Sequence, residues 1–367
     1  MLNVCYLISG DLWAGAEVMA YHLLRGLQAY EGLSLSVILL NEGILAEKIR
    51  ESGIRVHVVD ESQTSFFNIL LTIRKILNKQ TPDVIHSHRY KENILAYLTT
   101  RFFRRIKLIG TQHGMLEVHE RKTSLRQRLI SRCNFFLLSR CFHRVVGVSQ
   151  DIKNAFVKQY GFKEDFVSVI HNGVEIPDIP SMRGNRDSFV IGSSGRLFPV
   201  KDYHLMVEIA RLILRKTNHI RFQLAGDGPE RSKLQALIQD YGLDSLFELK
   251  GHLNDISAFY RDLDLYLNTS IHEGIPMSVL EAMAHGLPVI APNVGGLREI
   301  VDDEVGGYLL EGRNPEAYAD KCLLLYENKP LRQRISQAAR EKVVRAFSME
   351  NMAQQYYNIY LDLAKKS

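Results

Sequence analysis

The chain has 367 residues, 46% of them hydrophobic and 24% charged, which is typical of soluble globular proteins and excludes a disordered chain. The net charge of +5 is too modest to indicate a nucleic-acid partner. No apolar run reaches the roughly 18 residues that a spanning helix needs, and Met1–Ile8 lacks a signal-peptide pattern. Four scattered cysteines favour reduced thiols, so we expect a cytoplasmic protein.

Short apolar stretches with strand character alternate with helical periodicity from end to end. This predicts an α/β fold with parallel sheets covered by helices on both faces. Thirteen strands are too many for one sheet, so we expect two doubly wound domains, 1–173 and 188–347, with a linker over 174–187 and a last helix over 348–367. The expected strands are 4–8, 35–40, 56–59, 84–86, 108–111, 145–148, 167–170, 189–192, 222–225, 246–249, 265–268, 289–291 and 307–310.

Three segments of the first domain follow strands and are candidates for ligand contacts. The loop that contains Gly15 joins the first strand to the first helix, and its glycine permits close approach of a phosphate. His86 and His88 lie at the end of another strand and are candidates for the acceptor site. A metal is not expected there, because no third ligand has zinc-like spacing. His113 ends the next strand.

Residues 101–144 hold an excess of positive charge, with 11 basic and 2 acidic residues. Bulky apolar residues are interleaved with the arginines. Such a stretch predicts peripheral contact with anionic lipid, and a solvated helix with an inward apolar side explains it equally well.

The second domain opens with Gly195-Arg196-Leu197-Phe198-Pro199-Val200-Lys201 after its first strand. A glycine next to two cations suits a leaving diphosphate, because preorganised cations stabilise negative charge where it develops. The turns at Gly226 and at 251–253 follow the next two strands. Asp262-Leu263-Asp264 resembles a metal-binding Asp-x-Asp, but its alternation with the following strand favours a structural role.

Glu273 and Glu281 flank a proline in the most informative segment, 272–290. Pro276 has a fixed φ and suits the first turn of a helix, which would place the free N–H groups of residues 277–279 at the positive end of the helix dipole. One carboxylate then precedes the helix and the other lies on it. A ligand with a central phosphate and hydroxyls at both ends, such as a nucleotide sugar, fits this arrangement.

These motifs together resemble the signature of glycosyltransferase family 4, retaining enzymes with the GT-B fold, in which two Rossmann-like domains face a cleft. The resemblance covers nearly the whole chain and is most specific in the second domain. Two departures are Ala14 where the family usually has glycine, and Asp202 where it usually has glycine after the lysine.

The resemblance implies roles for individual residues. Glu273, His113, Arg196 and Lys201 would be catalytic: the two cations hold the diphosphate, and Glu273 and His113 contact the sugar. Donor-binding residues would also include Gly15, Gly226, Leu253, Ser278, Val279, Leu280 and Glu281, the last at the ribose. The predicted reaction moves a hexose-type sugar from a UDP- or GDP-sugar to a glycan or lipid-linked acceptor, without metal or cofactor, in cell-surface polysaccharide or glycolipid assembly.

The sequence has three other interpretations. In the first, Glu273 and Glu281 form a glycosidase acid/base pair, but a glycosidase needs no diphosphate site. A nicotinamide-dependent dehydrogenase would share the two-domain plan, yet no G-x-G-x-x-G follows the first strand. A non-catalytic nucleotide-sugar binder stays open at this stage.

Overall fold

The computed structural model describes residues 1–11, 13–101, 103, 105–114, 125–178, 188–253 and 255–365, with the backbone alone for 125–128. The chain divides into two compact units. Unit 1 comprises Met1–Gly173 and Met349–Ser367, and unit 2 comprises Val174–Ser348. Of the predicted linker, residues 179–187 lie outside the described part of the chain.

Unit 1 contains a parallel sheet of seven strands in the order β3-β2-β1-β4-β5-β6-β7. Its strands are β1 Leu2–Ile8, β2 Leu33–Leu39, β3 Arg55–Val58, β4 Val84–Ser87, β5 Lys107–Gln112, β6 Arg144–Gly147 and β7 Val167–Val169. Its helices are α1 Gly15–Leu27, α2 Ile44–Glu51, α3 Phe66–Gln80, α4 Tyr90–Thr100, α5 Leu125–Cys141, α6 Gln150–Tyr160 and α14 Met349–Lys365, with a 3-10 turn at Glu164–Phe166.

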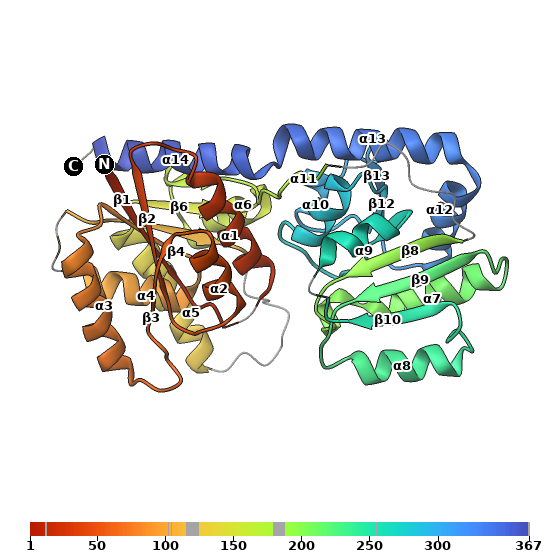
Figure 1. Ribbon diagram of the computed structural model, residues 1–367, viewed down its shortest axis with the longest axis horizontal. Coiled ribbons are helices and arrows are strands. Elements are labelled where there is room, and N and C mark those ends of the chain that lie inside the picture. The colour runs from red at the N-terminus through yellow and green to blue at the C-terminus, as the bar shows by residue number, and fades with distance from the viewer. Residues whose placement is uncertain are drawn as a thin grey trace. The chain divides into compact units, whose positions relative to one another are not determined.

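The last helix, α14, belongs to unit 1 and packs beside α1 (Figure 1). Close approach of the two helices depends on Gly26, because a Cβ there would lie 2.8 Å from Cβ of Ala353. The apolar and aromatic side of α14, which includes the fully buried Tyr356 and Tyr360, faces the interior. The hydroxyl of Tyr360 lies 2.6 Å from that of Tyr6 on β1, so α14 is fixed to an interior strand of the sheet.

Unit 2 contains a parallel sheet of six strands in the order β10-β9-β8-β11-β12-β13. Its strands are β8 Phe189–Ser194, β9 Ile220–Ala225, β10 Phe247–Gly251, β11 Leu265–Leu267, β12 Val289–Pro292 and β13 Gly307–Leu310. Its helices are α7 Tyr203–Leu214, α8 Arg231–Asp240, α9 Ile256–Asp262, α10 Met277–Ala284, α11 Leu297–Ile300, α12 Pro315–Glu327 and α13 Lys329–Ala346, with a 3-10 turn at Pro199–Lys201.

The predicted fold class is confirmed: both sheets are parallel, and every predicted strand is present with each end within two residues of its expected position. Such strands are buried on both faces, so they form apolar runs that are visible in the sequence. In a parallel sheet the loops that leave the strands all emerge at the carboxyl edge, where open α/β sheets bind ligands. The predicted motifs therefore gather at one edge of each unit.

Candidate functional site

The loop after β8 and the turn after β9 pack directly against each other in unit 2. The N–H of Gly195 donates to the carbonyl of Ala225 (3.0 Å), and the N–H of Leu197 donates to that of Asp227 (2.9 Å). A Cβ on Gly226 would lie 1.9 Å from the carbonyl oxygen of Gly195, so only glycine fits there. Gly226 thus lets the two backbone segments approach closely, and this contact fixes the loop that carries Arg196 and Lys201.

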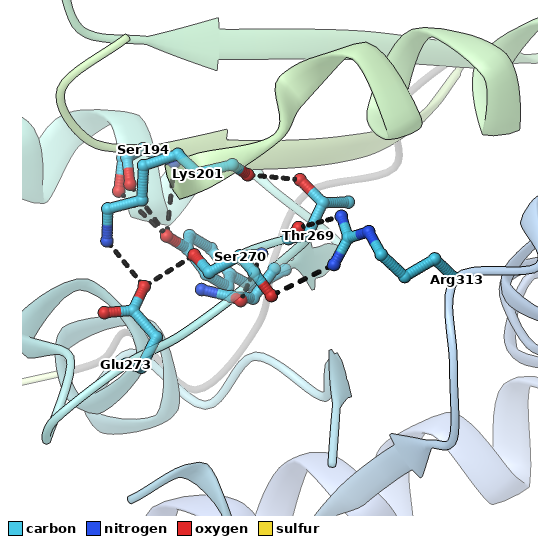
Figure 2. Close-up of polar contacts among 8 residues, drawn as sticks. Ser194, Lys201, Thr269, Ser270, Glu273 and Arg313 are labelled. Atoms are coloured by element: carbon cyan, nitrogen blue, oxygen red, sulfur yellow. Dashed lines mark hydrogen bonds and ion pairs between the residues drawn. The ribbon is translucent and has the colours of Figure 1, made fainter. Parts of the chain in front are cut away.

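Lys201 forms an ion pair with Glu273 (Figure 2). Its Nζ donates to Oε1 of Glu273 at 2.5 Å, and Oγ of Ser270 donates to the same oxygen at 2.6 Å. The side chains of Lys201 and Glu273 are only 20% and 10% exposed, so their charges are weakly screened by solvent. One predicted cation and one predicted carboxylate, 72 positions apart in the chain, therefore meet at the carboxyl edge of the sheet.

Arg313, in the loop after β13, fixes the two segments that carry this pair. Its guanidinium donates to the carbonyls of Thr269 (2.6 Å) and Ser270 (3.3 Å), as Figure 2 shows, and it is paired with the carboxylate of Asp202. Asp202 has a left-handed backbone (φ 43°, ψ 53°), a conformation that glycine adopts most easily. The aspartate at this position thus accepts backbone strain and gains the ion pair with Arg313.

The backbone around Glu273 is held by the two glycines that follow β12. A Cβ on Gly295 would lie 1.9 Å from the carbonyl oxygen of Glu273, and one on Gly296 would lie 1.9 Å from that of Gly274. The N–H of Gly296 donates to the Glu273 carbonyl at 3.2 Å. These glycines have a conformational role, and they hold the loop that presents Glu273.

Helix α10 begins one residue later than predicted. Pro276 has an extended backbone (ψ 117°) and lies before the first turn, which starts at Met277. The Pro276 carbonyl accepts from the N–H groups of Val279 (3.2 Å) and Leu280 (3.3 Å). The expectation that the Val279 N–H is free was therefore wrong. The first backbone N–H groups of a helix have no carbonyl partner within that helix. In α10 these are the N–H groups of Met277 and Ser278.

Glu281 lies in the second turn of α10 and is partly buried. Its Oε2 accepts a hydrogen bond from the hydroxyl of Tyr260 (2.8 Å), which in turn lies 2.8 Å from Oγ of Ser194 at the end of β8. Burial raises the pKa of Glu281 to about 7, with the Tyr260 hydrogen bond opposing the shift. Near neutral pH this carboxyl therefore exchanges between a form that donates and a form that only accepts.

Within the described part of the chain, the remaining predicted donor residues show no comparable contact. Arg196 is exposed, and its guanidinium lies over the ring of Phe198 at 4.9 Å from the centroid. Leu253 is partly buried in the loop after β10, and Gly15 is the exposed first residue of α1. Asp264 has the structural role expected of it, since its Oδ2 accepts from the N–H of Val190 on β8 (2.9 Å).

Three histidines stack in unit 1 near the carboxyl ends of β4 and β5. Nδ1 of His88 and Nε2 of His113 share a hydrogen bond of 2.9 Å, and the rings of His86 and His88 stack with centroids 4.4 Å apart. Burial lowers the pKa of His113 to about 3, with Arg89 adding to the effect, and burial also holds the pKa values of His86 and His88 well below their ordinary value. All three rings are thus neutral at physiological pH.

Only part of this stack is available to a ligand. His86 is fully buried, and its two nitrogens contact the hydroxyls of Tyr360 (2.7 Å) and Thr111 (2.8 Å), so we leave it out of the acceptor site. Among the described residues, Nε2 of His88 and Nδ1 of His113 have no hydrogen-bond partner. A cavity of about 220 Å³ is lined by His88, Arg89, Tyr90, Gln112, His113, Gly114, Asn134 and Phe135.

Two buried carboxyl groups of unit 1, Glu17 and Glu92, were not predicted. Glu17 accepts from Nη2 of Arg89 (2.6 Å), and Glu92 accepts from Oγ of Ser9. Burial raises the pKa of both. Within the described residues, no group of three or more His, Cys, Asp or Glu side chains is arranged to hold a metal ion.

Two family models match the chain in sequence. The model described as "Glycosyltransferase Family 4" matches residues 13–176, and the one described as "Glycosyl transferases group 1" matches residues 178–342. The chain belongs to glycosyltransferase family 4. It is therefore an enzyme of the retaining class, which sets aside the dehydrogenase and the non-catalytic binder.

Relatives and solved structures agree with this membership. The UDP-Gal:alpha-D-GlcNAc-diphosphoundecaprenol alpha-1,3-galactosyltransferase of Escherichia coli is 27% identical over 95% of this chain and 96% of its own. The poly(ribitol-phosphate) alpha-N-acetylglucosaminyltransferase of Staphylococcus aureus is 30% identical over 54% of this chain and 40% of its own. HepE of Anabaena, solved with UDP-glucose, has a TM-score of 0.85 at 21% identity and covers 99% of this chain and 100% of its own, which confirms the GT-B fold.

Proposed function

We propose that this glycosyltransferase moves a hexose-type sugar from a UDP-sugar to a lipid-linked or other glycan acceptor in the assembly of a cell-surface polymer. The observation that carries the proposal is the Lys201–Glu273 pair beside the start of α10. The choice of UDP over GDP is supported by the E. coli relative, named for UDP-Gal, and by the HepE complex with UDP-glucose.

Lys201 is the residue that we propose to stabilise the departing diphosphate. Its ammonium is partly buried and is held by Glu273, so it needs little reorganisation when the leaving group develops charge. The N–H groups of Met277 and Ser278 offer the positive end of a helix dipole to the same anion. Arg196, whose described contact is with the ring of Phe198, is exposed and is proposed as the second cation.

Glu273 is proposed to bind a hydroxyl of the transferred sugar. The bonds from Lys201 and Ser270 both fall on Oε1, and among the described contacts none falls on Oε2, which leaves that oxygen to accept from a sugar hydroxyl. A carboxylate neutralised by a lysine is a weak nucleophile. This favours a positioning role over attack on the anomeric carbon.

Glu281 is proposed to accept hydrogen bonds from the ribose hydroxyls. Its ionised form has the acceptor capacity for two hydroxyls, and the hydroxyl of Tyr260 holds the carboxyl group in place. Because its pKa is about 7, donor binding should favour loss of the proton from this residue.

His113 and His88 are proposed to contact the sugar and the acceptor respectively. Each has one buried ring nitrogen without a partner among the described residues, and both line the cavity of unit 1. Because the two neutral rings share one hydrogen bond, one outer nitrogen is a donor whenever the other is an acceptor. The pair can therefore donate a hydrogen bond to a ligand hydroxyl or accept one from it.

Peripheral attachment to the inner face of an anionic membrane is part of the proposal, because a lipid-linked acceptor is held in a bilayer. Of the stretch 101–144 on which it was predicted, residues 102, 104 and 115–124 lie outside the described residues, as do the side chains of Arg126 and Arg128. Among the described helices, none combines the length and hydropathy needed to cross a bilayer.

The proposal is tested by thermal unfolding of the purified protein with UDP-, GDP- and ADP-sugars, followed by transfer assays on lipid-diphosphate-linked glycans. A ligand at one hundred times its Kd stabilises the folded state by about 2.7 kcal/mol, so the preferred nucleotide should stand out. Stabilisation by a UDP-sugar and labelled product support the proposal. Stabilisation by a GDP- or ADP-sugar alone would contradict the choice of donor.

A further inference from the structure

Helix α3 exposes an unusual amount of apolar surface at its start. The side chains of Phe66, Phe67 and Leu71 are 52%, 67% and 41% exposed. The opposite side of the helix, with Ile69, Ile73 and Leu77, is buried against the domain, so these exposed residues are not needed for packing. Aromatic residues at the first turn and lysines further along, Lys75 and Lys79, give the outer face an apolar part and a cationic part.

Helix α5 has the same character. Leu129 and Phe136, seven positions apart and so on one side of the helix, are 70% and 62% exposed, and Arg132 and Arg140 are exposed as well. Both α3 and α5 pack against α4, so the three helices form one layer over the sheet of unit 1. We call the outer faces of α3 and α5 the apolar-basic surface, made of Phe66, Phe67, Leu71, Lys75, Lys79, Leu129, Arg132, Phe136 and Arg140.

Carboxylates are missing from this surface. Neither α3 nor α5 contains an aspartate or a glutamate in its sequence. The acidic residues that flank α3 in the chain are engaged elsewhere: Asp60 accepts from Ser62, Glu61 from Lys91 (2.5 Å) and Asp83 from the N–H of Asn3 (2.8 Å). The surface therefore presents positive charge beside apolar side chains without compensation from its own helices.

The start of the surface lies at the same edge of the sheet as the proposed site of transfer. Each helix of a parallel α/β unit begins at the carboxyl edge of the sheet, so the first turn of α3, with Phe66 and Phe67, lies at the same edge as His113 after β5. A bilayer in contact with this turn would hold a lipid-linked acceptor close to the edge that carries the cavity of unit 1.

We propose that the apolar-basic surface binds an anionic phospholipid bilayer, with Phe66, Phe67 and Leu71 at the headgroup–acyl boundary and the lysines and arginines on the lipid phosphates. The idea that this membrane contact serves a lipid-linked acceptor rests on the proposed function. The contact itself is inferred from the surface alone. Apolar side chains combined with basic ones and no acid are typical of interfacial helices, because burial of apolar area and attraction to anionic lipid act together. A protein partner is favoured less, because lysine is depleted in protein–protein interfaces and Lys75 and Lys79 lie on this surface.

Co-sedimentation of the full chain with vesicles tests this proposal, without donor or acceptor present. We expect binding to phosphatidylcholine vesicles that contain about a third of phosphatidylglycerol, and loss of binding in high salt, which screens charge. Phe66→Ser combined with Phe67→Ser, and separately Lys75→Glu combined with Lys79→Glu, should each weaken binding at least tenfold. The matched control is Leu324→Ser combined with Val344→Ser, two exposed apolar residues of unit 2.

The outcomes separate the membrane contact from the proposed sugar transfer. Absence of wild-type binding, equal binding to neutral vesicles, or equal weakening by the control would each overturn the membrane proposal, and absent vesicle binding would leave a protein partner as the occupant. The unfolding midpoint of each variant shows whether it is folded. If the phenylalanine variant is not folded, the lysine variant alone tests the membrane proposal. Loss of sugar transfer with intact vesicle binding would count against the proposed function only.

Discussion

The carboxyl edge of unit 2 holds ionisable side chains in opposite-charge pairs, Lys201 with Glu273 and Arg313 with Asp202, whereas that of unit 1 holds three stacked histidines kept neutral by burial. A charged side chain that is held in place by a partner can stabilise the opposite charge of a ligand. A neutral histidine ring can form a hydrogen bond with a ligand hydroxyl. The difference fits the division of labour expected in this family, with the diphosphate at unit 2 and sugar hydroxyls at unit 1.

The largest effect should come from Lys201→Ala, which removes the preformed cation of unit 2. Loss of a charge that stabilises the leaving group typically costs on the order of a hundredfold or more in kcat. Steady-state transfer rates measure it. Lys216→Ala, at a lysine that is 61% exposed, is the matched control and should leave the rate unchanged. Equal transfer rates for Lys201→Ala and Lys216→Ala would show that Lys201 does not stabilise the leaving group, and the proposed difference between the two units would be lost.

Acid sensitivity should reveal the neutral histidines of unit 1. Because burial lowers the pKa of His113 to about 3, the unfolded chain takes up a proton near pH 6.5 and the folded chain does not. Stability is thus fully present above pH 6.5 and falls as the pH drops toward 3.

His113→Asn removes this titration. Between pH 6.5 and 5 the wild type should lose on the order of 2 kcal/mol more unfolding free energy than the variant, as measured by urea unfolding. The buried Glu17 and Glu92 are present in both proteins and cancel in the difference. Parallel pH dependences would show that His113 is protonated in the folded state.

Donor affinity should depend on pH through Glu281, a carboxyl of unit 2 whose hydrogen bond comes from the neutral hydroxyl of Tyr260. With a pKa of about 7, its ionised fraction falls about tenfold for each pH unit well below that value. Calorimetric titration with a UDP-sugar should give a Kd about tenfold weaker at pH 6 than at pH 8. The Glu281→Gln variant should bind the UDP-sugar with a Kd that does not depend on pH. If the variant keeps the pH dependence of the wild type, that dependence arises from another group.

The smallest effect concerns Asp202, whose strained backbone and ion pair oppose each other. Asp202→Ala loses the pair with Arg313 and keeps the left-handed backbone, so it should destabilise the protein by about 1 kcal/mol. Asp202→Gly loses the pair and relieves the strain, so its unfolding midpoint should stay close to that of the wild type. A glycine variant less stable than the alanine variant would show that the backbone is not strained.

The contrast between the units also explains what the sequence could predict. Strands and motif loops followed from apolar runs and glycines, because local pattern and close packing leave little choice at positions such as Gly226. The parallel topology combined with the family resemblance predicted that Lys201 and Glu273 belong to one donor site, but not that they form an ion pair. The start of α10 was misplaced by one residue because Pro276 is compatible with both a first helical turn and the residue before it.

Residues that act through tertiary contacts had no local signal. Arg313 reaches Asp202 across 111 positions, and Tyr260 reaches Glu281 across 21 from another helix. His86 looked like the equal of His88 on the same strand end. Only the packing of α14, which brings Tyr360 over it, separates a buried structural histidine from one that lines a cavity.

UDP binding to the Lys201→Ala variant tests the central claim most directly, namely that the pair beside α10 receives the diphosphate. We predict that UDP raises the unfolding midpoint of the wild type and of Lys216→Ala alike, and that Lys201→Ala loses most of this rise at the same UDP concentration. An undiminished rise in the Lys201→Ala variant would contradict the account.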